Sequence, residues 1–287
     1  MHLVKRFSHL LSVSVLLLAG PAAAADWVRF ELIDQSALPI VRASLNGSGG
    51  QRLVLDAGFP DFLLDTTIVE GLGLKLASRG EMTEIDFYGR PERVPVAYLQ
   101  KLRIGDVDFS TVRTLLIEGE DGTGRGGLRS YGRIGHGVLK PLRLTVHYPR
   151  QLLYLEPSPE ADVPEGGVSY RSLDRFLLVP VHVRRSGAEL TANFIVDAGT
   201  SSTLVDRKWA EDNGFAPKKA PEAGIPLLEI GGFRAESVRV LTGDMKELPY
   251  EGQPVGVIGA DILLGLSVTY DFARELIWLV KVEKETS

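Results

Sequence analysis

The chain has 287 residues, of which 44% are hydrophobic and 24% charged, and its formal net charge at pH 7 is −5. This is ordinary globular composition, long enough to bury a substantial core in one large domain or two lobes. The acidic balance excludes a strong basic field for nucleic-acid binding, and the lack of cysteine excludes disulfides, a cysteine nucleophile and thiolate metal sites.

The N-terminus predicts a signal peptide over residues 1–25. Lys5 and Arg6 form a positively charged start, a short apolar stretch follows, and Ala23 and Ala25 fit an A-x-A cleavage site. Cleavage there changes the net charge from −5 to −7 and predicts an exported protein, periplasmic or secreted. The alternative is an uncleaved N-terminal membrane anchor, because a short apolar segment can also be retained.

The mature chain is expected to begin with two strands. Residues 39–58, PIVRASLNGSGGQRLVLDAG, have the pattern of a strand, a glycine-rich turn and a second strand. The phrase LVLDAGFPDFLLD, residues 53–65, ends that second strand with an Asp-Ala-Gly tripeptide at Asp56 and continues into another apolar run. A short helix is predicted next, with Asp65 as its N-cap.

The middle of the first half predicts a hairpin and further strands. Residues 81–99, EMTEIDFYGRPERVPVAYL, contain a turn-like Gly-Arg-Pro between alternating stretches, and strands are expected at 99–109 and 111–118. The glycine-rich segment 119–127 lacks the Lys-Ser/Thr of a phosphate loop, so no nucleotide is implied. Residues 134–155 then predict Ile-Gly, a helical turn and a two-stranded hairpin.

The second half of the chain repeats the first. The phrase FIVDAGTSSTLVD, residues 194–206, aligns with LVLDAGFPDFLLD at an offset of 141, which places Asp197 on Asp56. The stretch that begins at Ile258 aligns with the one that begins at Ile134 at an offset of 124. The second half is therefore 17 residues shorter in its middle, where the first half has its hairpin.

This duplication predicts a mostly β protein of two related lobes. Residues 156–169, rich in proline, glycine and acidic residues, are expected to be the linker. The predicted division is a signal peptide at 1–25, an N-terminal lobe at 26–155, the linker, and a C-terminal lobe at 170–287.

The repeated Asp-Ala-Gly tripeptide predicts a pair of carboxylates. Each aspartate ends a buried strand, and the glycine lets backbone N–H groups turn toward the carboxylate. Two related lobes then bring the two aspartates together across a pseudo-two-fold axis. Carboxylates about 3 Å apart cannot both ionise, so they share one proton. One activates a water as general base and the other protonates a carbonyl oxygen, which hydrolyses an amide without metal or covalent intermediate.

These motifs resemble the aspartic peptidases of the retropepsin and pepsin type. That family has hydrophobic-hydrophobic-Asp-Thr/Ser-Gly-Thr/Ser/Ala, and later a hydrophobic-hydrophobic-Gly motif before a short helix. Residues 196–200 fit the first motif and residues 257–259 fit the second. In the first half, residues 55–58 fit, Phe59-Pro60 departs, and residues 133–135 fit in part. The resemblance is to a bacterial, exported chain with two retropepsin-like halves, and it extends over nearly the whole mature chain.

The resemblance implies a bilobal acid-protease-like β-barrel fold with two homologous lobes and pseudo-two-fold symmetry. It implies a catalytic pair, Asp56 and Asp197, and a flap whose candidate substrate-binding residue is Tyr88, although Tyr88 can equally be an ordinary hairpin tyrosine. It also implies supporting residues in the two active-site loops, namely Ala57, Gly58, Ala198, Gly199 and Thr200. We expect a monomer that acts on peptides or unfolded proteins, with no metal, cofactor, nucleotide or nucleic acid.

Two departures from the family motifs leave both a peptidase and a non-catalytic protein as possible interpretations of the sequence. Ala57 and Ala198 replace the Thr or Ser whose hydroxyl bonds to the opposite lobe in the family, and Phe59 lacks the hydroxyl that bonds to its own lobe's aspartate. The sequence therefore supports an exported aspartic endopeptidase, or a catalytically degenerate relative that binds peptides or a partner in the cleft. A third option is a peptidase that is active only as a dimer, through its better-conforming second half.

Overall fold

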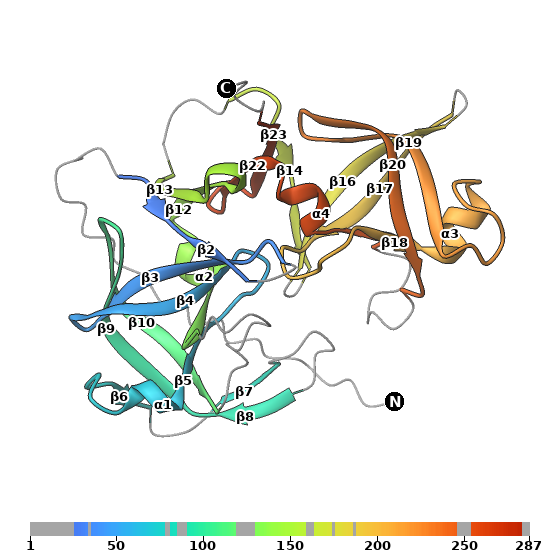
Figure 1. Ribbon diagram of the computed structural model, residues 1–287. Coiled ribbons are helices and arrows are strands. Elements are labelled where there is room, and N and C mark those ends of the chain that lie inside the picture. Colours follow the sequence, from blue (N-terminus) through green and yellow to red (C-terminus); the bar gives the residue numbers. More distant parts are fainter. Residues whose placement is uncertain are drawn as a thin grey trace, which may run out of the picture.

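The computed structural model describes residues 26–282, apart from gaps at 34–35, 78–80, 85–90, 119–129, 159–163, 174–175, 186–187 and 246–253. Strands dominate the described chain, and the α-helices are only one or two turns long. Two β-rich lobes lie on either side of a smaller sheet (Figure 1). The mostly β, two-lobed fold expected from the sequence is confirmed.

The first lobe is an eight-stranded sheet in the order β2-β3-β4-β11-β5-β10-β9-β6. An additional pairing between β3 and β9 closes most of it into a barrel. Alternating burial along the strands points one set of side chains into that barrel, which forms the core of the lobe. The strands are β2 (Glu31–Leu32), β3 (Pro39–Leu45), β4 (Ser48–Asp56), β5 (Phe62–Asp65), β6 (Lys75–Leu76), β9 (Val96–Ile104), β10 (Val107–Ile117) and β11 (Gly132–Gly135).

The second lobe is a seven-stranded sheet in the order β15-β16-β17-β21-β18-β20-β19, closed by pairing between β16 and β19. Its strands are β15 (Arg171–Leu173), β16 (Phe176–Arg185), β17 (Ala188–Val196), β18 (Leu204–Asp206), β19 (Glu222–Ile230), β20 (Phe233–Gly243) and β21 (Gly256–Ile258). The order β16-β17-β21-β18-β20-β19 repeats β3-β4-β11-β5-β10-β9 of the first lobe.

The register of the two lobes is equivalent as well. In the first lobe Ile134 of β11 lies opposite Leu55 of β4, in a parallel pair. In the second lobe Ile258 of β21 lies opposite Val196 of β17, again in a parallel pair. These are the residues that the two sequence offsets align, so the predicted duplication and pseudo-two-fold relation are confirmed.

A third sheet joins the lobes, in the order β1-β13-β12-β22-β23-β14. It consists of β1 (Val28–Arg29), β12 (Leu142–His147), β13 (Leu152–Pro157), β14 (Val168–Ser169), β22 (Leu266–Asp271) and β23 (Leu276–Lys281), with the 3-10 helix η1 (Tyr148–Arg150) between β12 and β13. The two closing hairpins of the sequence repeat meet where β12 pairs with β22. The predicted linker overlaps β13 and β14 at its ends, and the division at 155 and 170 stays a prediction.

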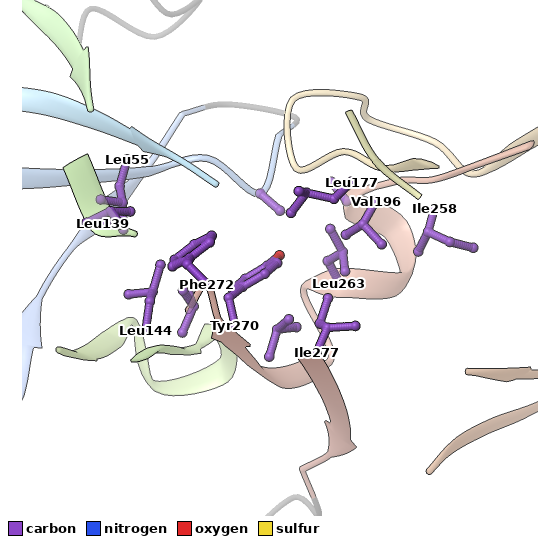
Figure 2. Packing of buried hydrophobic residues seen from close by; sticks show 14 of the residues in the cluster. Leu55, Leu139, Leu144, Leu177, Val196, Ile258, Leu263, Tyr270, Phe272 and Ile277 are labelled. Atoms are coloured by element: carbon purple, nitrogen blue, oxygen red, sulfur yellow. The ribbon is translucent and has the colours of Figure 1, made fainter. Parts of the chain in front are cut away.

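Buried side chains from both lobes pack on this joining sheet. Tyr270 and Phe272 lie between Leu55 of the first lobe and Val196 and Leu263 of the second (Figure 2). The rings of Tyr270 and Phe272 are stacked, with centroids 5.7 Å apart. The ends of β4 and β17, which carry the two aspartates, therefore lie over one continuous core.

Short helices follow the motif strands in both lobes. Asp65 accepts a bond from the Thr67 N–H at 2.8 Å to cap α1 (Thr66–Val69), and Asp206 accepts one from the Trp209 N–H at 2.9 Å to cap α3 (Arg207–Asp212). The predicted N-cap at Asp65 is confirmed. The helices α2 (His136–Leu139) and α4 (Ala260–Leu263) begin directly after the glycines of the second motif. No helix among the described residues is both long and apolar enough to cross a membrane.

The extra length of the first half does contain a hairpin. β7 (Glu81–Glu84) and β8 (Pro91–Val94) pair antiparallel, with Glu84 opposite Pro91. Val94 at the base of this hairpin is buried against Val96 and Leu115. Tyr88, the predicted flap residue, lies outside the described residues, so its role stays a prediction.

Candidate active site

Asp56 ends β4 and is almost buried, with 7% of its surface exposed. Its Oδ1 atom accepts a hydrogen bond from the Gly58 N–H at 3.0 Å. Its Oδ2 atom accepts one from Nη1 of Arg133, also at 3.0 Å, which makes an ion pair. Arg133 belongs to β11, the strand that runs parallel to β4. Both oxygens of the carboxylate are therefore held by donors from the first lobe.

Asp197 follows β17 and is half-buried. Its Oδ1 atom accepts a bond from the Gly199 N–H at 2.8 Å, and its Oδ2 atom accepts one from the Thr200 hydroxyl at 2.5 Å. The glycine donor is the same as at Asp56, whereas the second donor differs. This turn has the arrangement that the family resemblance implies for Gly199 and Thr200.

Phe59 stands where the second lobe has Thr200, and its side chain is buried. It packs in a small cluster with Leu63, Val94, Val96 and Leu115. The guanidinium carbon of Arg133 lies 5.3 Å from the centre of the Phe59 ring. The hydroxyl missing at this position is thus replaced by a charged donor from another strand. Sequence reasoning identified the gap but not Arg133, whose one signal was a charged residue in a hydrophobic-hydrophobic-Gly motif.

The glycines of the second motif let the two loops of each lobe approach closely. A methyl group on Gly135 would lie 2.3 Å from the Asp61 carbonyl oxygen and 2.4 Å from that of Phe59. A methyl group on Gly259 would lie 2.8 Å from the Ser202 carbonyl oxygen and 2.9 Å from that of Thr200. These distances are too short for any real side-chain carbon, so only glycine fits.

Backbone hydrogen bonds lock the loops together in the same way in both lobes. The His136 N–H donates to the Phe59 carbonyl at 2.7 Å, and the Ala260 N–H donates to the Thr200 carbonyl at 2.8 Å. Each bond joins the Asp-Ala-Gly loop to the start of the following short helix. The aspartates are therefore presented by rigid, equivalent supports.

The Asp-Ala-Gly turn of the second lobe also contacts the first lobe. The Ala37 N–H of the first lobe donates to the Ala198 carbonyl of the second at 2.7 Å. Ala57 and Ala198 line the same small cavity, together with the buried Tyr148 and Tyr270. The lobes are thus joined here by a backbone bond and apolar packing, where the family resemblance implied threonine hydroxyls.

Burial raises the pKa of Asp56, and the negative charge of Asp197 raises it further. The Arg133 guanidinium and the Gly58 N–H oppose this rise, but they do not cancel it. Burial likewise raises the pKa of Tyr148 and Tyr270, and the charge of Asp56 adds to both shifts. Asp197 is therefore near enough to Asp56 for its charge to influence the ionisation of the Asp56 carboxyl.

The described residues contain no group of three or more His, Asp or Glu side chains arranged to hold a metal ion. His136, which begins α2 behind the first turn, stacks on Phe272 at 6.3 Å. Burial lowers the pKa of His136, which favours a neutral ring inside the lobe.

No protein-family model and no curated protein matches the chain. Among solved structures, it is similar to the crystal structure of the aspartic proteinase from Irpex lacteus, with a TM-score of 0.61. The sequence identity is 14%, and the match covers 92% of this chain and 99% of that chain. The chain has a pepsin-like fold. At this identity the likeness shows the fold alone.

Within this pepsin-like fold the predicted loop residues occupy equivalent places in the two lobes. Asp56 ends β4, Asp197 directly follows the equivalent strand β17, and the turn after Asp197 accepts a backbone bond from Ala37 of the first lobe.

Proposed function

We propose that the protein is an aspartic endopeptidase that hydrolyses peptide bonds in peptides or unfolded proteins with a water activated by Asp56 and Asp197. One observation carries the proposal: each lobe presents one carboxylate at the end of an equivalent strand or directly after it, with Oδ1 bonded to the N–H of the glycine two residues later. The charge of Asp197 also contributes to the raised pKa of Asp56. The likeness of the fold to an aspartic proteinase supports the same reaction class.

The two aspartates have different roles in this proposal. Asp56, whose pKa is raised by burial, holds the shared proton and delivers it to the carbonyl oxygen of the scissile bond. Asp197, which accepts bonds from Gly199 and Thr200, takes a proton from the attacking water. The tetrahedral intermediate then collapses: Asp197 protonates the leaving nitrogen, and a hydroxyl of the intermediate returns a proton to Asp56 as the carbonyl reforms.

This mechanism requires one proton on the pair. Activity is lost at low pH when both carboxyls are protonated, and at high pH when both are ionised, so the profile is bell-shaped with an acidic optimum. The proposed setting is outside the cytoplasm, after removal of residues 1–25. The proposed enzyme is a monomer without metal or cofactor.

The test is cleavage of an unfolded protein and of a peptide library between pH 3 and 8. The variants Asp56→Asn and Asp197→Asn should each abolish cleavage and keep the fold, because the amide is nearly isosteric with the carboxyl group. Asp212→Asn, on the exposed face of α3, is the matched control and should cleave normally. A pepstatin-type inhibitor should block the wild type. Full activity in either active-site variant would refute the proposal.

The ion pair between Arg133 and Asp56 favours a second candidate. A permanent cation on a catalytic carboxyl opposes its protonation, so the turn can instead belong to a protein that binds peptides without cutting them. Under this alternative, the wild type cuts nothing at any pH, and Asp197→Asn binds peptides as tightly as the wild type does.

A further inference from the structure

The two carboxylates receive donors in one common pattern. At each aspartate, Oδ1 accepts from the N–H of the glycine two residues later. At each aspartate, Oδ2 accepts from a side chain, which is Thr200 at Asp197 and Arg133 at Asp56. Arg133 thus donates to the oxygen atom that corresponds to the one bound by the Thr200 hydroxyl.

The position that provides the side-chain donor to the aspartate differs between the lobes, and in each lobe the other position holds an apolar residue. By the sequence offsets, Phe59 corresponds to Thr200 and Arg133 corresponds to Val257. In the second lobe the hydroxyl at 200 binds the aspartate, and Val257 is buried in an apolar cluster. In the first lobe the side chain at 59 is buried in an apolar cluster, and the residue at 133 binds the aspartate. The register of β11 on β4 equals that of β21 on β17, so this difference occurs on equivalent backbones.

We propose that Arg133 is a positioning residue that replaces the hydroxyl absent from Phe59, orients the Asp56 carboxyl for catalysis and shifts cleavage toward lower pH. This inference rests on the proposed function and deepens it. It explains both departures from the family motifs together, because Arg133 supplies the hydrogen-bond donor that Phe59 lacks.

The surroundings of Arg133 suit this task. The Phe59 ring lies beside the guanidinium at 5.3 Å, and an aromatic ring at this range attracts and orients a cation. The planar guanidinium stays charged at every pH at which a protein is folded, so its bond to Asp56 persists when the dyad changes protonation. The Gly58 N–H binds Oδ1 of Asp56 and Arg133 binds Oδ2, so the two donors together fix the orientation of the carboxyl plane.

The charged and titratable groups facing Asp56 come from several elements. They are Arg133 on β11, Asp197 after β17, Tyr148 on η1 and Tyr270 on β22. Burial and Asp197 favour the protonated form of Asp56, whereas Arg133 favours the ionised form. If the charge of Arg133 is removed, the pair keeps its single proton to a higher pH. Both limbs of the activity profile then move upward, by roughly one pH unit.

The decisive experiment restores the second-lobe pattern in the first lobe. We compare Phe59→Thr, Arg133→Val and the double variant with the wild type by kcat/KM from pH 3 to 8. Arg133→Val should lose about 10- to 100-fold, because Oδ2 of Asp56 then lacks its donor. The double variant should recover most of that loss and keep the upward pH shift. Arg133→Lys should keep the wild-type pH limbs, and Arg239→Met, an exposed arginine on β20, should change nothing.

A second measurement does not depend on cleavage. The pKa of Asp56 is followed by carbon NMR of its carboxyl group in the Asp197→Asn background, with Arg133 retained in one protein and the substitution Arg133→Met added in the other. The pKa should rise by roughly one unit when the arginine is lost. An unchanged pKa, or an unchanged pH profile in a cleaving enzyme, overturns the inference and leaves the proposed function intact. A rise in pKa in a protein that never cleaves refutes the proposed function but upholds the electrostatic role of Arg133.

Discussion

Thr200 and Phe59 show how a single position changes the chemistry of a turn. The Thr200 hydroxyl lies 2.5 Å from Oδ2 of Asp197, which is half-buried. Phe59 turns into an apolar cluster and leaves its aspartate to Arg133. The two carboxyls therefore differ in burial and in the charge of the side chain that donates to Oδ2, and such a difference assigns separate acid and base roles to a pair.

Thr200→Ala should lower kcat/KM by about 10- to 100-fold, since a hydrogen bond to a charged group is worth about 1.5–3 kcal/mol. Its thermal midpoint should change little, because Thr200 is only partly buried. Ser201→Ala removes the neighbouring hydroxyl and is the control, which we expect to retain full activity. Equal losses in the two variants would show that Thr200 acts through the loop and not through Asp197.

At this scale the sequence identified the residues of the two turns but not their partners. Asp56, Asp197 and the glycines after them follow from the repeated phrase, because main-chain turns have local signatures. Arg133 contacts Asp56 across 77 residues of sequence. Strand register brings the two positions together, but the reach of a long side chain to a neighbouring strand is not encoded in any local pattern.

Among the structural elements, β11 and β21 determine how tightly each lobe closes behind its aspartate. Each strand ends in a glycine or next to one, and this glycine lies so close to the loop after β4 or β17 that a side chain has no space. The helices α2 and α4 then begin at once and donate backbone bonds to that loop. The close contact of these glycines with the loops, together with the backbone bonds from the helices, therefore holds the two aspartates in place.

Gly135→Ala should destabilise the protein by about 3 kcal/mol, because the added methyl group would lie 2.3 and 2.4 Å from two backbone oxygens and the loop would have to shift. The measurement is the free energy of unfolding in urea. Gly224→Ala on β19 is the control, since a methyl group there meets nothing within 4 Å. A loss at Gly135 no larger than that at Gly224 would mean that the loop moves aside easily.

The strands of each lobe and their repetition in the other lobe were predictable, since duplication and period-two patterns are visible in the sequence. The joining sheet was not, because the pairing of β12 with β22 unites segments that are far apart and belong to different halves. For the same reason the ends of the predicted linker proved to be strand residues. The hairpin β7–β8 was predicted, and its action as a flap stays a prediction.

At the scale of the whole molecule, a buried ion cluster ties the two lobes together at the joining sheet. Asp271 of β22 has no exposed surface and accepts bonds from Arg143 of β12 at 3.2 Å and from the Ser158 hydroxyl at 2.7 Å. Arg274, at the turn before β23, also donates to it at 3.2 Å. Burial acts to raise the pKa of Asp271, but these bonds outweigh it and hold the pKa below its usual value.

Asp271→Asn should therefore destabilise the protein by about 3 kcal/mol at pH 7, because the nearly buried Arg143 then keeps only the more exposed Glu156, 3.7 Å away, as an anionic partner. A carboxyl whose pKa is depressed on folding stabilises the protein above its unfolded value, near 3.8, and loses that contribution as the pH falls through the lower folded value. The difference in the free energy of unfolding between wild type and variant, measured in urea, should stay constant from pH 7 to about 4 and decrease only below pH 4. Asp212→Asn, on the surface, is the control at each pH.

Because the cluster keeps its charge in mild acid, the lobes stay joined at the pH where the proposed catalytic pair shares one proton. If the difference in unfolding free energy between wild type and Asp271→Asn already disappeared between pH 7 and 5, another group would hold the lobes together.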